Sequence, residues 1–246
     1  IVFQRWANTG MDLALRNFWH VGWNVGRNFR VLDDLDTRGG PPIVRPANAF
    51  YNVFLSTDSR RTLRLQVNTG GDRDTEGGWN QRFGTTLTLQ PSTALQASIG
   101  ANYNYGWTVA QWVENTDVDG DEEDDHVYGS LRRNVVDVTA RATYSFDRNL
   151  TLQVYMQPFG AVGDYTDIRR LARPGSFDFE PAVLDDDPDF NSKSLRTNTV
   201  LRWEYRPGST LFVVWNLSTS HAARPGIFSP FDGLGDTFGA EGTHVF

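Results

Sequence analysis

The sequence predicts an all-β fold, an antiparallel, up-and-down transmembrane β-barrel. Residues 1–246 are expected to form a single domain with about ten strands, which is the C-terminal part of a larger barrel. Three observations lead to this prediction. Apolar and polar side chains alternate with a period of two along most of the chain. Short turns and long links follow one another in succession. Aromatic residues gather towards the ends of the alternating segments, on their apolar side.

The clearest hairpin begins with residues 195–206, where Leu201 and Trp203 belong to an apolar set and Arg202 belongs to a charged set. Pro and Gly at 207–208 are typical of a tight turn, and a second alternating run follows directly. This alternation suits a water-soluble β-sandwich with an apolar core. It equally suits a membrane barrel with lipid outside and a polar lumen.

The other predicted strands share this alternation and cover residues 1–9, 12–26, 51–58, 63–68, 83–90, 95–105, 136–146 and 150–157. Short turns are expected near residues 10, 60, 92, 148 and 208, and long links over 27–46, 69–78, 107–126, 163–192 and 221–240. Successive connections of an up-and-down sheet lie at opposite ends, so the short turns should share one rim and the long links the other. Sandwiches use Greek-key links and propellers use repeats, and neither pattern is visible here.

Composition narrows the function classes. No stretch approaches the roughly 18 apolar residues of a membrane helix, which excludes helical spanning. The chain has no Cys, so neither a thiolate nucleophile nor a cysteine metal site is available. The net charge of −7 disfavours nucleic acid as a partner. Acidic residues are concentrated in two links, at 117–125 and 185–189.

Four stretches carry a resemblance to a known family: LRWEYRPGSTLFVVW (201–215), LTLQVYMQPFGAVGDYTDIRRLARP (150–174), NAFYNVFLSTDSR (48–60) and RGGPPIVRPA (38–47). They resemble the C-terminal barrel of the DUF5916 family, whose function is largely undefined. The resemblance implies an outer-membrane barrel, with a signal peptide and a carbohydrate-binding-module-family-9-like domain ahead of it. The chain starts without Met and residues 242–246 have the pattern of a strand that is beginning, so we expect a piece of a larger barrel.

Charged side chains on the predicted polar face form the first candidate site. The predicted lumen-lining residues are Arg16, Arg64, Arg82, Asp137, Arg141, Arg196, Arg202, Glu204 and Arg206. A basic lumen would favour anionic solutes. Alternatively, the same arginines could pair with the two acidic residues of the set and stiffen the interior. The sequence leaves both interpretations open.

The acidic link at 115–126 forms the second candidate site. Asp117, Asp119 and Asp121 surround Gly120 and offer hard oxygen ligands at spacings that could bind Ca²⁺. The glycine and the final glutamate do not fall where an EF-hand loop needs them. The alternative is a solvated loop that divalent ions bridge to lipopolysaccharide. No other cofactor is predicted.

The predicted function is a channel or transport component for small or glycan-like solutes in the bacterial outer membrane, without catalysis. Its expected partners are outer-membrane lipid, lipopolysaccharide, partner subunits and the carbohydrate-binding domain. One alternative is a barrel that anchors loops for binding a ligand or partner protein. A second is an outer-membrane hydrolase, although the four His residues show no paired metal spacing and no nucleophile elbow is present.

Overall fold

The computed structural model describes residues 5–223 and 242–245, and these residues form an all-β structure, as predicted. Most strands join one antiparallel sheet in which neighbours in sequence are neighbours in space. In spatial order its main strands are β1 (Trp6–Ala14), β2 (His20–Asn28), β5 (Asn48–Ser56), β6 (Leu63–Asp74), β7 (Trp79–Leu89), β8 (Leu95–Thr116), β9 (Asp125–Ser145), β10 (Leu150–Leu171), β12 (Phe190–Arg206), β13 (Ser209–Ala223) and β14 (Gly242–Val245). The up-and-down antiparallel arrangement is therefore confirmed.

Three short strands complete the fold. β11 (Phe179–Pro181) extends the sheet beside the end of β10. β3 (Val31–Asp33) and β4 (Ile43–Arg45) form a separate two-stranded sheet within the link between β2 and β5. The sequence predicted only a long link over residues 27–46, but regular pairing resumes within it on either side of Gly39, Gly40, Pro41 and Pro42. No helix in the described residues has the length and apolar character to span a membrane.

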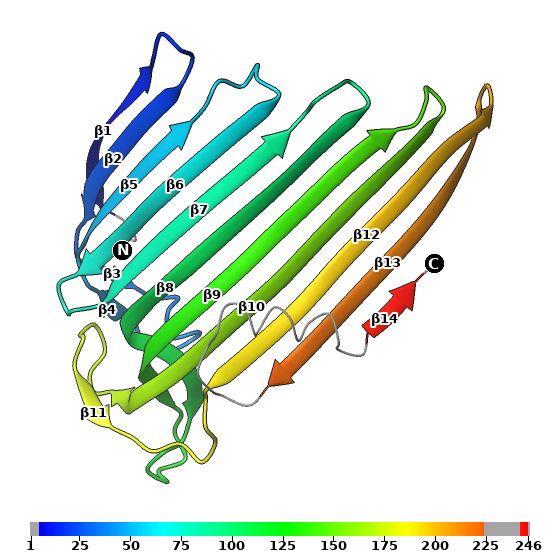
Figure 1. The fold of residues 1–246 in the computed structure, drawn as a ribbon. Helices are drawn as coiled ribbons and strands as arrows, with labels where there is room; N and C mark the ends of the chain where they lie inside the picture. The colour runs from blue at the N-terminus through cyan, green and yellow to red at the C-terminus, as the bar shows by residue number, and fades with distance from the viewer. Residues whose placement is uncertain (1–4, 224–241, 246) are drawn as a thin grey trace.

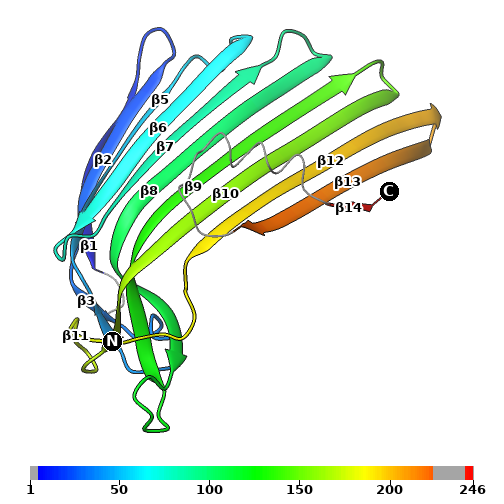
Figure 2. The ribbon, with the colours of Figure 1, turned by 60° about the horizontal axis from the view of Figure 1, so that its bottom comes forward.

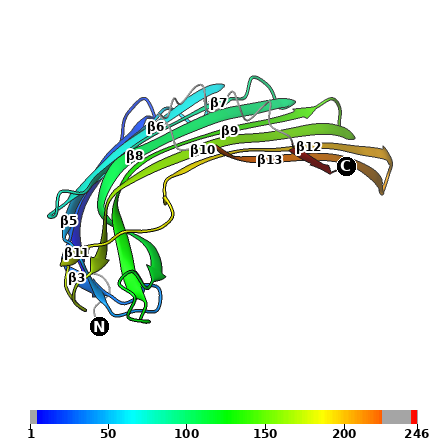
Figure 3. The ribbon, with the colours of Figure 1, turned by 90° about the horizontal axis from the view of Figure 1, so that it is seen from below.

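The main sheet is a curved, open surface (Figures 1 and 2). β1 lies at one edge and β14 at the other, and these two edges do not pair with each other in the described residues. Viewed from below, the sheet forms an arc, and the ends of β8 and β9 turn in beneath it together with the β3–β4 hairpin (Figure 3). Barrel closure is therefore not observed in the described part of the chain.

The first predicted turn, near residue 10, is wrong. β1 and β2 meet instead at residues 15–19, where the Asn17 side chain accepts a hydrogen bond from the Trp19 backbone N–H (3.2 Å) and Phe18 adopts a φ of 63°. The predicted strand over 12–26 thus contains a turn, and Gly10 lies inside β1 opposite Asn24. The apolar alternation has the same parity on both sides of this turn, so a period-two pattern could not reveal it.

Three predicted long links are shorter than expected because the adjoining strands continue into them. β6 and β7 leave only residues 75–78 as their connection, β8 and β9 leave 117–124, and β10 continues to residue 171. Glycine and polar residues in these strand ends were interpreted as loop. The strict succession of short and long connections is therefore not observed, because the 75–78 link is short. Of the last predicted link, 224–241 lies outside the described residues, while β14 confirms the strand expected near the end.

The polar face of the sheet, which we assign to the inner side of the arc, carries glycines at several close approaches between strands. Side chains on the concave side of a bent sheet converge, and several positions there are glycine. A Cβ atom on Gly26 would lie 2.5 Å from the Phe50 ring and 2.7 Å from the Ala7 carbonyl oxygen. On Gly106 it would lie 2.5 Å from the Trp79 carbonyl oxygen. Larger side chains at these positions would flatten the curve.

A small core lies at the rim that carries the longer links. Val127, Tyr128 and Leu131 of β9 are buried, as are Ile43 and Val44 of β4. The Tyr128 ring also contacts Phe179 of β11, with ring centroids 5.4 Å apart. We call this assembly of β3, β4, β11 and the ends of β8 and β9 the rim cap.

We predict that Gly106→Ala lowers the free energy of unfolding by about 1–3 kcal/mol, because the new methyl group meets backbone atoms that cannot move aside. The measurement is urea unfolding in detergent micelles, followed by tryptophan fluorescence. Ser98→Ala, on the same strand and face, is the control and should leave the midpoint unchanged. Equal midpoints for both variants would contradict the crowding argument.

Candidate functional site

The inner face of the sheet brings most of the predicted lumen residues onto one surface. Arg141 lies opposite Ser98 of β8 and Tyr155 of β10, and Arg196 lies opposite Gln157 and Ser218 on the same face. The register places six further members of the set as follows: Arg64 and Arg82 on β6 and β7, Asp137 on β9, and Arg202, Glu204 and Arg206 on β12. Arg206 adjoins the β12–β13 turn. Arg16 is the exception, because it lies in the β1–β2 turn and not on a strand.

These arginines could either attract anions or pair with acidic side chains of the same face. Arg202 forms an ion pair with Glu204, with Nη2 and Oε2 3.3 Å apart. Asp137 instead accepts a hydrogen bond from the Asn102 amide (3.1 Å). Among the described residues, no carboxylate lies within 4.0 Å of Arg82, Arg141 or Arg196, so pairing does not account for most of the positive charge.

A polar hollow of about 420 Å³ opens on the inner face across β6 to β9. Arg82, Arg133 and Asp137 contribute its charged side chains. Its other lining residues are Asn68, Phe83, Asn102, Tyr103, Asn104 and Val135. Guanidinium groups bind carboxylates and phosphates in a bidentate manner, and amides both donate to and accept from hydroxyl groups. This chemistry suits a small hydroxylated solute that carries a negative charge.

Sequence reasoning missed Arg133 and the three asparagines of the hollow. The alternation near residue 133 is weak, because neighbouring Arg132 and Asn134 are polar as well. The asparagines were assigned to the polar face but were not singled out, because no charge marked them. Their grouping depends on the strand register, which aligns Asn68, Gly84, Asn102 and Asp137 in one row across four strands. The glycine in that row lets the Asn68 and Asn102 side chains approach each other, because a Cβ atom on Gly84 would lie 2.5 Å from Asn68 Oδ1 and 2.8 Å from Asn102 Oδ1.

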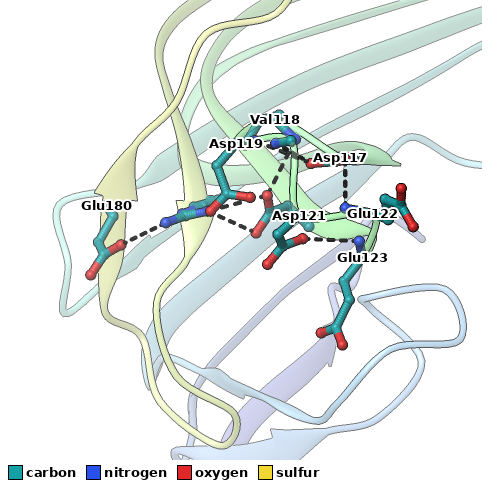
Figure 4. A network of polar contacts seen from close by, with 10 residues as sticks. Asp117, Val118, Asp119, Asp121, Glu122, Glu123 and Glu180 are labelled. Carbon is teal, nitrogen blue, oxygen red and sulfur yellow. Dashed lines mark hydrogen bonds and ion pairs between the residues drawn. The ribbon is translucent and has the colours of Figure 1, made fainter.

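The acidic link forms the tip of the β8–β9 hairpin (Figure 4). Asp117 accepts hydrogen bonds from the backbone N–H groups of Glu122 (2.9 Å), Gly120 (2.6 Å) and Asp119 (3.2 Å). These backbone donors lower the pKa of Asp117 below its usual value. The Asp117 carboxylate therefore stabilises the turn itself.

Arg170 of β10 binds the other carboxylates of this hairpin. Its Nη1 contacts Asp119 and lies 3.3 Å from Asp125, while its Nη2 lies 3.4 Å from Glu180. Hydrogen bonds to Asp119 and Asp125 raise the pKa of the guanidinium, which stays charged. Arg170 thus joins the acidic hairpin to β10 and to the adjoining end of β11.

The predicted calcium ligands are only partly brought together. Carboxylate oxygens of Asp117, Asp119 and Asp125 lie within 4.8 Å of one another. Asp121 is not in this group, because its carboxylate caps the Glu123 N–H at 2.9 Å. Asp125 takes its place because it returns along the hairpin, opposite Thr116. Calcium binding stays a prediction, and Arg170 already occupies two of the three carboxylates.

If Ca²⁺ binds at this hairpin, it competes with Arg170. We predict that Arg170→Gln strengthens Ca²⁺ binding by about thirtyfold, since removing one unit charge about 4 Å from a divalent ion changes the interaction by about 2 kcal/mol in water-like surroundings. Asp125→Asn should weaken binding, and Asp121→Asn is the matched control that should not. Isothermal titration calorimetry with calcium chloride measures all three. An absence of binding heat in both the unsubstituted protein and Arg170→Gln would rule out the calcium site.

Comparison with known proteins identifies a family but no activity. No functionally curated protein matches the chain. One family model, described as a domain of unknown function (DUF5916), matches residues 2–246. The match covers nearly the whole sequence and confirms the resemblance seen in the motifs. The chain therefore belongs to the DUF5916 family.

Proposed function

We propose that this chain forms part of the wall of a transmembrane β-barrel in a bacterial outer membrane, where it conducts small anionic or glycan-like solutes without catalysing a reaction. The observation that carries the proposal is the contrast between the two faces of the curved sheet. The outer face is apolar and exposed, and the inner face is polar and positively charged. A water-soluble sheet of this size would need a second layer over its apolar face.

The exposed apolar face supports contact with lipid. Ile99 is 51% exposed, Val213 is 54% exposed and Trp203 is 47% exposed. The hollow on this face, about 410 Å³ in volume, is lined mainly by aliphatic side chains such as Leu87 and Met156. Large contiguous apolar patches are rare on soluble monomers and typical of surfaces that meet lipid or a partner.

Two groups of aromatic side chains border the apolar band, as interfacial girdles do. Tyr144 and Phe146 pack edge to face at one end, with ring centroids 4.7 Å apart. At the other end Tyr103 stacks on Tyr105 at 5.3 Å, and Tyr105 also meets Trp79 at 5.4 Å.

The spacing of these two groups agrees with a bilayer. The two aromatic residues nearest the middle of the band are Tyr103 and Tyr144. Tyr103 lies opposite Val136 of β9, so the distance between them corresponds to residues 136–144 of β9. At roughly 3.4 Å per residue this is about 27 Å along the strand, or about 21 Å in height for a strand tilted by about 40°. The outer members, Tyr105 and Phe146, give about 31 Å by the same estimate. The apolar band of outer-membrane barrels, about 25 Å tall, falls between these limits.

A second candidate function is the presentation of a binding surface by the rim cap. The observation that favours it is the cap's own buried core, which a plain loop would not need. Cation–π contact fixes the cap further, since the Arg38 guanidinium lies 3.8 Å from the Trp112 ring centroid. Conductance in a planar bilayer separates the two functions, because an anchor with a plugged lumen carries no current.

We predict that spin labels on adjacent residues of β8 report opposite surroundings in liposomes. The chain has no Cys, so Ile99→Cys and Ser98→Cys can each be labelled without background. In power-saturation measurements, the label at 99 should respond to oxygen, which concentrates in lipid. The label at 98 should respond to a water-soluble nickel complex. Equal access of the nickel complex to both positions would contradict the lipid-facing assignment.

We predict that the arginines of the inner face give the pore an anion preference. Arg82→Gln should lower the anion-over-cation permeability ratio by about fivefold, the effect of removing about 1 kcal/mol of attraction in water-like surroundings. Asp137→Asn is the matched change of opposite sign and should raise the ratio. The reversal potential in a salt gradient measures both. Cation selectivity of the unsubstituted protein would overturn the anion assignment.

A further inference from the structure

We propose that the outer face carries a binding site for the phosphate group of an anionic lipid headgroup, at the rim where the longer links lie. The inference rests on the proposed function, because it requires that this face meets lipid. Its basis is a row of side chains that crosses six strands just beyond the aromatic group of Tyr103 and Tyr105. The row lies on the opposite face of the sheet from Arg82 and Asp137 of the inner polar hollow, and only Arg133 borders both the hollow and the recess at the centre of the row.

Strand register defines the row. From β2 to β9 each residue lies opposite the next, in the order Arg27, Ala49, Arg73, Trp79, Trp107 and Arg132. Alternation places all of them on the same face as Val53 and Tyr103. Two tryptophans are thus flanked by arginines at the edge of the apolar band.

The centre of this row is hollowed. A recess of about 360 Å³ is lined by Trp79, Tyr105, Gly106, Trp107, Arg132, Arg133 and Asn134. The Arg132 guanidinium carbon lies 5.9 Å from the Trp107 ring centroid, so its charge is held over the recess. The Tyr103 hydroxyl donates to the Asn134 amide oxygen at 3.0 Å, which leaves the Asn134 NH₂ group as a further donor.

The charge of the row is largely uncompensated. Within residues 5–223, no carboxylate lies within 4.0 Å of the guanidinium groups of Arg27, Arg73 and Arg132. Asp164 of β10 is the carboxylate that lies beside Arg132 in the row. Guanidinium groups bind phosphate oxygens in a bidentate manner, so an anion carried by the membrane complements this surface.

The position of the row favours a lipid headgroup over a free ion. Tryptophans at the end of an apolar band occupy the headgroup region of a bilayer. Arginines there extend along apolar surface towards the same layer. A phosphate delivered by a lipid would therefore meet the indole rings and the guanidinium groups together.

The test uses native mass spectrometry of the full chain in detergent micelles that contain equal amounts of phosphatidylglycerol and phosphatidylcholine. We expect preferential retention of phosphatidylglycerol. Arg132→Gln should lower the retained ratio by about fivefold, the effect of one basic residue at an anionic surface. Asp164→Asn should raise the ratio, and this gain cannot come from misfolding. Arg61→Gln, in the β5–β6 turn at the opposite rim, where Arg61 pairs with Asp58, is the control and should leave the ratio unchanged.

Two results would overturn the site. One is equal retention of the two lipids by the unsubstituted protein. The other is complete displacement of phosphatidylglycerol by inorganic phosphate, which would identify a free-anion site. Insertion into liposomes is measured separately with the spin labels described above. Lipid selectivity without insertion would contradict the proposed barrel wall but not the headgroup site. Insertion without lipid selectivity would contradict the headgroup site alone.

Discussion

One antiparallel hydrogen-bond ladder, running from β1 to β14, is the constraint on which the rest of the structure depends. A slip of one residue in any strand would move its side chains to the opposite face. The register shifts of the long strands lie outside the central band, between Thr108 and Gln111, Trp112 and Glu114, Thr166 and Arg169, and Glu204 and Arg206. The central band therefore keeps every strand in phase, which allows one face to be apolar and the other polar across the whole sheet.

Curvature follows from the same ladder. With side chains of different size on its two faces, the sheet bends towards the smaller ones. Glycines such as Gly22 and Gly26 lie under the Phe54 and Phe50 rings on the inner face, while aliphatic and aromatic side chains spread on the outer face. The polar hollow and the proposed headgroup site also follow from this ladder, because each is built from cross-strand neighbours on one face of the sheet.

The rim cap depends on the places where the ladder is interrupted. The bulges near residues 108–114 let the ends of β8 and β9 leave the arc. Ser130 then donates to the Val109 carbonyl oxygen at 2.8 Å, and Arg169 donates to the same oxygen at 2.6 Å. These bonds fix the departing hairpin against β10, and Arg170 fixes its acidic tip. The rim of the proposed pore therefore carries folded structure.

The sequence by itself determined the all-β class, the up-and-down order and the face of each central side chain, because a two-residue period survives any uncertainty in strand ends. It could not predict the turn at 15–19 or that the glycine-rich residues 69–74 belong to a strand. Nor could it predict that Asp125, and not Asp121, lies beside Asp117 and Asp119. All three depend on which residues meet across strands. The polar hollow and the arginine–tryptophan row likewise required the register. Pairing between strands is a property of tertiary structure, and the local pattern of one strand does not contain it.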